Sequence, residues 1–448
     1  MKKSILIYLF VLMAGALAFG SCSDDSKPEP MSGLKMNKVA LMLAQGETFQ
    51  LQAIPRPADA AIDIKWTSSD ASIVSVDDRG VITANDNRGS AVVTARAGSY
   101  FCTCTVTLIS SQPMDVSSSL MNTDLENLIY SRDVLLPANK RIMQGFDISK
   151  SGVMYYSQIS AGAGTSTYVS RAGSPGQSAE TYYMDCRYFG HGTQIVAEEA
   201  EDGKTYIWMN SNGNMATNGE YGENMSISRV EFQPGAVHEN CAGKTFFLNK
   251  NGEYDQQVSI DFENRRLFIG SRKGVRCFWV FDLDEALALP EKDMTVSTNV
   301  EGVVTERVVE GYDLNDCKVL GHFTIAGGGD QATDIYTYNH QGTAIHGDYI
   351  YFYEGNAITL PGTDNFTCKA YVTVLDYSGN ICVPRTEVKA VAETDKWKEL
   401  GLTTTGWCEP EGIKVSDQGI YLGIASRDGS SSTRRANILF YQCTAPKK

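Results

Sequence analysis

Short runs in which hydrophobic and polar residues alternate cover most of this chain, and turn-forming residues separate them. Between residues 34 and 109, Val, Thr and Ala alternate, and Gly, Asp and Asn interrupt the runs. This pattern is typical of antiparallel strands that bury one face. Seven short strands are predicted there, at 41–43, 49–51, 64–66, 73–76, 81–83, 91–95 and 102–108. Seven strands in this length predict an immunoglobulin-like sandwich.

The same segment carries a specific motif. Residues 65–70, 73–76 and 80–84 read KWTSSD, IVSV and GVITA, and a further strand follows at 89–95. This order resembles the bacterial Ig-like domain of group 2. We expect Trp66 to fill the core and Gly80 to supply a positive φ between two strands. In that family the module is a spacer or adhesive unit on cell surfaces, so the resemblance implies a spacer here.

An internal repeat extends over residues 120–448. Each unit opens with a polar residue, usually followed by Gly, on a short strand, and an apolar strand forms a hairpin with it. The opening residues are Gln144, His191, Gln257, Gln341 and Glu411. Five units of four strands predict a five-bladed β-propeller. The fold class is therefore all-β, an Ig-like β-sandwich followed by a five-bladed β-propeller.

Details of the repeat lead to further expectations. Fourth strands are predicted at 227–232, 322–325 and 388–391, and residues 290–340 are expected to form an insertion between blades. The last unit has only three strands before the chain ends. We expect residues 128–131 or 134–136 to complete its sheet, because a completed sheet hides strand edges.

Four motifs recur in order at matching places in the repeat, at residues 143–146, 190–194, 340–342 and 409–413. They resemble the five-bladed propeller shared by staphylococcal phage receptor-binding proteins, teichoic-acid biosynthesis protein C and helveticin-type bacteriocins. The third unit departs from the pattern, with Val258 in place of Gly. The resemblance implies binding to bacterial surface polymers or glycans, and it implies no established catalytic mechanism.

The N-terminus predicts export. Lys2 and Lys3 precede an apolar run at 5–18 that is too short for an ordinary spanning helix, which indicates a signal peptide. Small residues then lead into Cys22, which resembles a lipobox and implies acylation of this cysteine. The acidic residues after it resemble the tag of some Bacteroidetes lipoproteins on the outer face of the outer membrane. We expect a lipid-anchored protein at the cell surface, with the periplasmic face as the alternative.

These observations divide the chain into five parts. Residues 1–21 are the signal peptide and 22–33 a tether, and 34–109 form the Ig-like domain. Residues 110–119 are a linker, and 120–448 form the propeller.

The composition of the chain limits the classes of molecule that it is expected to bind. The net charge of −14 argues against nucleic acid and against adhesion to anionic lipid, so the membrane is reached through the lipid anchor only. Ten cysteines besides Cys22 show no CxxC spacing, so no structural zinc, other metal or cofactor is expected. Cys102 and Cys104 share one strand face and are expected to be small core residues.

The opening residues of the repeat are the candidate site. The innermost strand of a blade lines the channel, so these side chains are expected to converge at one mouth. Their amides, imidazole and carboxylate suit sugar hydroxyls, a water cluster or a cation. The alternative is structural: they satisfy one another and close the channel. Aromatic residues, among them Trp208, Trp279, Tyr353 and Trp407, are expected to be mainly core, with some as sugar-stacking platforms.

Glu409 and Glu411 extend the candidate site. Two residues apart on a strand, they face the same way and could form the carboxylate pair of a glycosidase. Pro410 between them argues instead for an irregular entry into the strand. The favoured function is binding of an extracellular glycan or cell-wall polymer, without enzymatic activity. Two alternatives stay open: a glycan-degrading hydrolase or lyase that uses these carboxylates, and a structural or adhesive surface protein.

Overall fold

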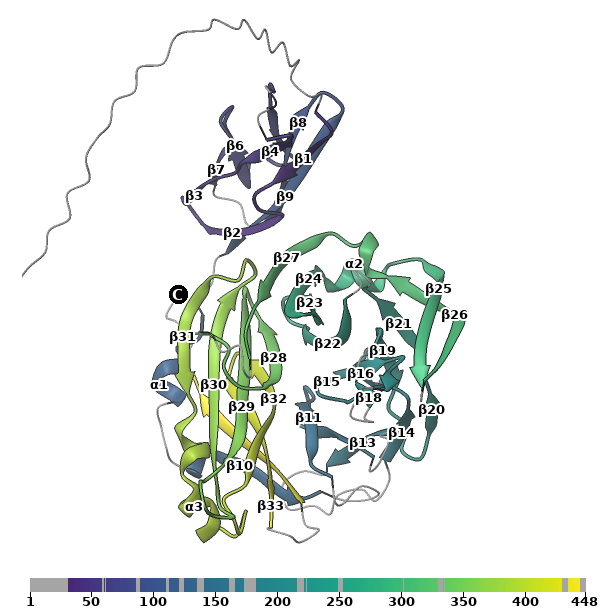
Figure 1. The fold of residues 1–448 in the computed structure, drawn as a ribbon, viewed down its shortest axis with the longest axis vertical. Helices are drawn as coiled ribbons and strands as arrows, with labels where there is room; N and C mark the ends of the chain where they lie inside the picture. The colour runs from purple at the N-terminus through teal and green to yellow at the C-terminus, as the bar shows by residue number, and fades with distance from the viewer. Residues whose placement is uncertain are drawn as a thin grey trace, which may run out of the picture.

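The computed structural model of the chain describes residues 31–58, 60, 62–85, 89–109, 113–120, 125–134, 141–160, 166–172, 183–215, 221–222, 224–248, 253–300, 302–328, 333, 335–428 and 434–443. The expected signal peptide, Cys22 and most of the tether lie outside these residues. The structure is all-β, with 60% of the described residues in strands. It consists of a small N-terminal unit and a larger C-terminal unit (Figure 1).

Two sheets face each other in the N-terminal unit. One has the order β2 (Ala40–Ala44), β9 (Tyr100–Ile109), β8 (Gly89–Ala97) and β5 (Lys65–Ser68). The other has the order β3 (Thr48–Gln50), β7 (Val81–Ala84) and β6 (Val74–Val76), and β1 (Gly33–Met36) pairs separately with β4 (Ala53–Arg56). All seven expected strands are present. One hydrophobic core joins the two sheets, as expected for a sandwich.

Trp66 and Gly80 act together in this core. Trp66 packs against the core cluster, and Gly80 has a φ of +81°. A Cβ built on Gly80 would lie 2.5 Å from the Trp66 ring, so the glycine serves both the turn and the tryptophan. Cys104 is buried in the same core, Cys102 packs against it, and both thiols are free.

Five sheets form most of the C-terminal unit, and the first two carry extra strands. Each sheet contains four antiparallel strands in regular order. They are β11 (Met143–Ile148), β12 (Met154–Ile159), β13 (Ser166–Ala172) and β14 (Tyr183–Arg187); β15 (Ile195–Glu199), β16 (Thr205–Ser211), β19 (Ser226–Glu231) and β21 (Lys244–Phe247); β22 (Tyr254–Asp261), β23 (Arg266–Lys273), β24 (Val275–Asp282) and β27 (Val319–Ile325); β28 (His340–His346), β29 (Tyr349–Thr359), β30 (Phe366–Asp376) and β31 (Ile381–Glu387); and β32 (Cys408–Ser416), β33 (Gly419–Arg427), β34 (Arg434–Gln442) and β10 (Leu128–Asp133).

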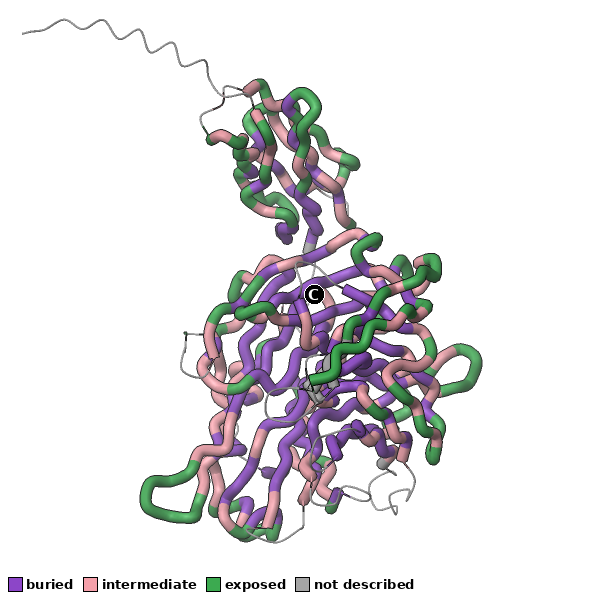
Figure 2. Tube along the Cα trace, turned by 45° about the vertical axis from the view of Figure 1, so that its right-hand side comes forward, coloured by how far each residue is buried: buried purple, intermediate pink, exposed green. Residues whose placement is uncertain are grey.

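The first strands of these sheets lie next to one another. β11 contacts β15, β15 contacts β22, β22 contacts β28, β28 contacts β32, and β32 contacts β11. Hydrophobic side chains fill the spaces between neighbouring sheets, and the strand interiors are buried (Figure 2). The arrangement is propeller-like.

The last sheet is completed as expected. β10 pairs antiparallel with β34, so residues from before the first repeat close the sheet of the last one. Residues 113–119, expected in a linker, instead belong to the C-terminal unit. Met114 and Val116 are buried in its core, and the Met114 amide donates to Tyr351 Oη at 3.2 Å. The short helix α1 (Val116–Leu120) forms there.

Three expectations about strands were wrong. The 291–313 region is a hairpin, β25 (Glu291–Val300) and β26 (Val303–Asp313), inserted between the third and fourth strands of the third sheet rather than between sheets. β26 pairs with β21 and so extends the second sheet. Residues 227–232 supply the third strand of their sheet, and Lys389–Ala392 is a 3₁₀ helix, because β31 takes the fourth position.

Remaining elements are short. The pair β17 (Asn214–Met215) and β18 (Tyr221–Gly222) forms a ribbon, and β20 (Val237–Glu239) pairs parallel with β14. The other helices are η1 (Leu125–Asn127), α2 (Leu283–Leu287), η2 (Leu314–Asp316) and α3 (Thr394–Glu399). Among the described residues, no helix has the length and apolar character needed to cross a bilayer.

The two units contact each other through β2. Met42 is buried among side chains of the C-terminal unit, and its Sδ accepts a hydrogen bond from the Tyr377 amide at 3.0 Å. The Met42 amide donates to Ser378 Oγ at 3.1 Å. The N-terminal unit is therefore packed onto the turn between β30 and β31.

Candidate functional site

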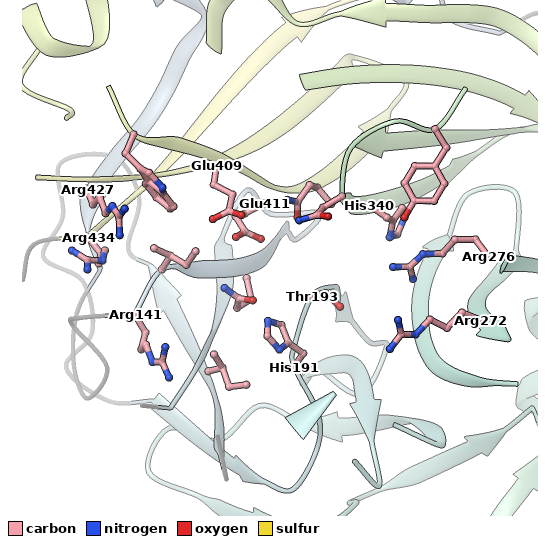
Figure 3. Close-up of a pocket in the computed structure, with 17 residues that line it drawn as sticks. Arg141, His191, Thr193, Arg272, Arg276, His340, Glu409, Glu411, Arg427 and Arg434 are labelled. Carbon is pink, nitrogen blue, oxygen red and sulfur yellow. The ribbon is translucent and has the colours of Figure 1, made fainter. Parts of the chain in front are cut away.

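A cavity of about 640 Å³ lies where β11, β28 and β32 begin (Figure 3). Polar and charged side chains from four of the five sheets and from the loop before β15 line it, together with a few aromatic and aliphatic ones. Its lining residues are Arg141, Ile142, Gln144, Ile159, His191, Thr193, Arg272, Arg276, Tyr336, Asn339, His340, Gln341, Trp407, Glu409, Glu411, Arg427 and Arg434. It lies at the end of the sheets where the first strands start.

Five of the six candidate binding residues line this cavity: Gln144, His191, Gln341, Glu409 and Glu411. The sixth, Gln257, is one step away. Its Nε2 donates to Thr193 Oγ1 at 3.2 Å, and Thr193 lines the cavity. The repeat therefore brings these positions together in space. Cys22, the expected lipidation site, lies outside the described residues.

Glycine after the polar residue has a packing role. A Cβ on Gly145 would lie 2.9 Å from the Thr193 carbonyl oxygen, and one on Gly412 would lie 3.0 Å from the Phe146 ring. Gly412 also has a φ of +95°. Any larger residue would push neighbouring first strands apart, so the glycines allow the strands to approach closely at the cavity.

The side-chain amides of Gln341 and Gln257 form hydrogen bonds with residues that are not candidate binding residues. Gln341 Nε2 donates to the Gly355 carbonyl at 3.0 Å, and Gln257 bonds to Thr193. The link across the centre comes from Gln194, which belongs to the 190–194 motif but is not one of the candidate binding residues. Its side-chain amide bonds to both backbone groups of Thr343. Gln194 therefore supplies a structural lock that had been expected of the candidate residues.

Both candidate carboxyls have raised pKa values. Burial raises the pKa of Glu411 well above its usual range, and the neighbouring Glu409 adds to this effect. Burial also raises the pKa of Glu409, and the positive charge of Arg427 partly opposes it. The cavity therefore holds carboxyl groups that keep their protons more readily than exposed ones.

Five arginines line the cavity, and none was a candidate from the sequence: Arg141, Arg272, Arg276, Arg427 and Arg434. Four of them lie at the ends or starts of second and third strands, which carry no repeated motif, and Arg141 lies just before β11. A guanidinium remains charged at all ordinary pH values and presents several donors in one plane. The cavity is therefore rich in fixed positive charge.

Of the aromatic candidates, one reaches the cavity. Trp208, Trp279 and Tyr353 are buried core residues, as expected of most. Trp407 lines the cavity, and the Arg427 guanidinium carbon lies 4.4 Å from the centre of its ring. The arginine thus lies over one face of the mostly buried Trp407 ring, and this pair of an aromatic ring and a charged donor forms part of the cavity wall.

His340 is held as a neutral group. It is buried, and burial together with the positive charge of Arg276 lowers its pKa well below the usual range. Its Nε2 lies 2.8 Å from Thr343 Oγ1. Within the described part of the chain, no group of three His, Cys, Asp or Glu side chains is placed to hold a metal ion.

Glu354 positions the segment that carries Tyr336 to His340. This carboxylate is fully buried and accepts hydrogen bonds from the backbone amides of Thr337 at 2.7 Å and Tyr338 at 2.6 Å. It also pairs with Arg385, whose guanidinium stacks on a tyrosine ring. These bonds of Glu354 hold in place the segment that forms one wall of the cavity.

Comparison with known proteins identifies the N-terminal unit. Residues 34–107 match the family model described as bacterial Ig-like domain (group 2), which confirms the expected Ig-like domain. An uncharacterised protein of Clostridium acetobutylicum is 48% identical over 65 residues, which are 14% of this chain. The chain spans 7% of the length of that relative.

Three solved structures are similar to parts of the chain. A catalytically inactive virginiamycin B lyase from Staphylococcus aureus, solved with quinupristin, is 11% identical and covers 69% of this chain and 99% of its own, at a TM-score of 0.25. Domains 5–6 of the S-layer protein SbsC are 12% identical over 47% of this chain and 98% of theirs, at 0.17. A GH10 xylanase from termite gut with a bacterial Ig-like domain is 22% identical over 17% of this chain and 20% of its own, at 0.14. TM-scores this low establish no shared overall fold.

Proposed function

We propose that this chain is a cell-surface lipoprotein whose C-terminal unit binds an extracellular glycan or cell-wall polymer. The binding site is the cavity at the start of β11, β28 and β32, and the five sheets are the blades of a five-bladed propeller. The Ig-like domain serves as a spacer. The lipid on Cys22 supplies the only attachment to the outer membrane.

One observation carries this proposal. Side chains that hold equivalent places in the repeat, Gln144, His191, Gln341 and Glu411, line a single cavity together with Trp407. Saccharide sites combine convergent donors and acceptors with an apolar platform, and a cavity of this size accommodates several sugar rings. The repeat alone would bring these positions together, so the support for binding is the open cavity between them and the mixture of donors, acceptors and an aromatic ring that lines it.

The position of the Ig-like domain supports its role as a spacer. β28 begins at the cavity with His340 and ends at His346. That far end lies beside the turn after β30, because Tyr377 Oη donates to the Gly347 carbonyl at 2.5 Å. Met42 packs on the same turn. The Ig-like domain is thus attached at the end of the sheets opposite to the cavity, which leaves the site away from the tethered side.

A binding screen of the full chain against glycans and cell-wall polymers tests the proposal. His191→Ala and Glu411→Ala should weaken binding of the ligand found, by about 0.5–1.5 kcal/mol for a neutral contact and up to about 3 kcal/mol for a charged one. His238→Ala, in β20 outside the cavity, is the matched control and should bind normally. Thermal melts of the same variants must show a retained fold.

Two results would reject the binding proposal. One is a screen in which no saccharide or polymer binds to the folded chain. The other is a ligand that binds equally well to both cavity variants, because the site would then lie elsewhere.

A glycan-degrading activity is the second candidate. The observation in its favour is that Glu409 and Glu411 share one cavity and have raised pKa values, which is the property required of a general acid. Incubation of the full chain with each bound glycan should then release new chain ends. Glu411→Gln should abolish this release and leave binding intact. If the wild-type chain binds a glycan but releases no product, only the binding function is supported.

A further inference from the structure

Two pairs of arginines occupy opposite ends of the cavity. Arg272 and Arg276 lie at the hairpin between β23 and β24, and we call them the β23–β24 basic end. Arg427 and Arg434 lie at the matching hairpin between β33 and β34, the β33–β34 basic end. Figure 3 shows the two ends on opposite sides, with His191, Glu409 and Glu411 between them.

Negative charge compensates the β23–β24 basic end only in part. Asp255 is the shared partner of both arginines, at 3.2 Å from Arg272 Nε and 3.6 Å from an Arg276 nitrogen. One carboxylate thus faces two guanidinium groups. Since both side chains also line the cavity, donors remain directed toward a ligand.

The β33–β34 basic end places two arginines beside each other at the cavity. Burial and the like charge of Arg427 lower the pKa of Arg434, and Asp428 opposes this effect. Glu409 is the carboxyl beside Arg427, and burial favours its neutral form. Two neighbouring cations at a cavity wall favour an anionic group there.

Arg141 adds an unsatisfied donor on the same side of the cavity (Figure 3). One of its terminal nitrogens donates to the Ser160 carbonyl at 3.0 Å. Its Nε is buried and has no hydrogen-bond partner. A buried donor without a partner is costly, and an acidic oxygen in the cavity would satisfy it.

The charge of the cavity is opposite to that of the whole chain. Asp and Glu outnumber Lys and Arg by 53 to 39 over the full sequence. Among the lining residues, five arginines face two glutamates with raised pKa values. A general surface effect therefore cannot explain the arginines, and they fit a ligand that carries negative charge.

We infer that the ligand is an acidic glycan or cell-wall polymer, with carboxylate or phosphate groups along it, that spans the cavity and places one acidic group at each basic end. This inference rests on the proposed function and specifies its ligand. Guanidinium groups bind carboxylate, sulfate and phosphate through paired hydrogen bonds. Trp407 supports a sugar ring at the β33–β34 end, and Gln144 and His191 face the hydroxyls between the ends.

Titration calorimetry of the full chain with defined probes tests this inference. The probes are hexagalacturonate, its methyl ester, a neutral hexaglucoside and a hexamer of glycerol phosphate. At least one of the two acidic hexamers should bind, at least tenfold more tightly than the neutral or esterified one, and its affinity should fall as salt increases. The two acidic probes distinguish carboxylate from phosphate as the recognised group.

Paired variants test the two-ended geometry. R272Q/R276Q and R427Q/R434Q should each weaken binding of the acidic hexamer by about ten- to hundredfold. Arg427→Lys keeps the charge and loses the paired hydrogen bonds, so its effect should be smaller than that of R427Q. Arg79→Gln, exposed on the Ig-like domain, is the matched control.

The outcomes separate this inference from the proposed function. Equal binding of the acidic hexamer and its ester, or full binding by either paired variant with its fold retained, would overturn the inference. Binding of the neutral or esterified hexamer alone would also overturn the inference, but it would still support glycan binding. If none of the probes and no polymer in the wider screen binds, both proposals fail.

Discussion

Gln194 holds the backbone of Thr343 through both ends of its side-chain amide. Its Nε2 donates to the Thr343 carbonyl, and its Oε1 accepts from the Thr343 amide at 3.2 Å. Both residues are buried. Gln194 directly precedes β15 and Thr343 lies in β28, so one side chain joins the second and fourth sheets across the centre of the unit.

Gln194→Ala should therefore destabilise the fold. The substitution leaves a buried amide and a buried carbonyl without partners, at about 1–3 kcal/mol for each group. We expect the free energy of unfolding to fall by about 2–4 kcal/mol, measured by denaturant unfolding. Gln418→Ala, in the exposed turn after β32, should change it by less than about 0.5 kcal/mol. Equal stability of both variants would show that the central link is dispensable.

The raised pKa of Glu411 predicts a pH dependence of stability. The folded chain keeps this proton at pH values where the unfolded chain, with the ordinary pKa of 4.5, has released it. The stabilising effect of the proton is full below the ordinary pKa and is lost as pH rises toward the raised value. Glu411→Gln, which cannot ionise, should melt at a higher temperature than the wild type at pH 8 and at a similar temperature at pH 4.

Thermal melts between pH 4 and pH 8 measure this difference. Asp284→Asn is the control. Arg265 lowers the pKa of this exposed carboxyl, so the stability difference between this variant and the wild type should depend on pH with the opposite sign. A difference between Glu411→Gln and the wild type that stays constant with pH would contradict a buried, protonated Glu411.

Strand positions could be predicted where the strand is buried and failed where it is exposed. The first two strands of each sheet are mostly buried, and all were found. β31 has Pro384 in its middle and exposed residues along it, so its sequence lacks that pattern. Proline is tolerated there because β31 is an edge strand. The apolar 388–391 run predicts a strand, but most of it lies in a 3₁₀ helix that buries its apolar side chains.

The residues of the candidate site also fall into two groups, those that the sequence predicts and those that it does not. Gln144, His191, Gln341 and Glu411 could be found because the repeat places them at one step of each first strand. Arg272 and Arg427 lie at the ends of second strands, where no motif recurs. Their approach to one cavity depends on how the third and fifth sheets face each other. Only the three-dimensional arrangement brings them together.

Acylation of Cys22 remains a prediction from the sequence alone. Cys22→Ala should move the protein from the membrane fraction to the soluble fraction, because acyl chains supply about 0.8 kcal/mol per buried methylene. Fractionation and labelled fatty acid measure this change. Cys382→Ala, at an exposed cysteine in β31, is the control and should remain in the membrane. Label retained by the Cys22→Ala protein would contradict the anchor.

Met42 predicts how firmly the Ig-like domain is held. Its side chain is 4% exposed and packs with Tyr377 and neighbouring residues of the C-terminal unit. Met42→Ala removes this packing and the contact of Sδ with the Tyr377 amide, at about 2–3 kcal/mol for a buried side chain that leaves a cavity. Small-angle X-ray scattering should then show a wider distribution of distances between the units.

Val39→Ala provides the matched control. Val39 lies just before β2 and is 54% exposed, so its loss should leave the scattering curve unchanged. Binding of a ligand in the cavity should be equal in both variants, because the Ig-like domain contacts the opposite end of the sheets. A Met42→Ala chain with the wild-type scattering curve would show that other contacts fix the domain, and one with weakened binding would show that the spacer influences the site.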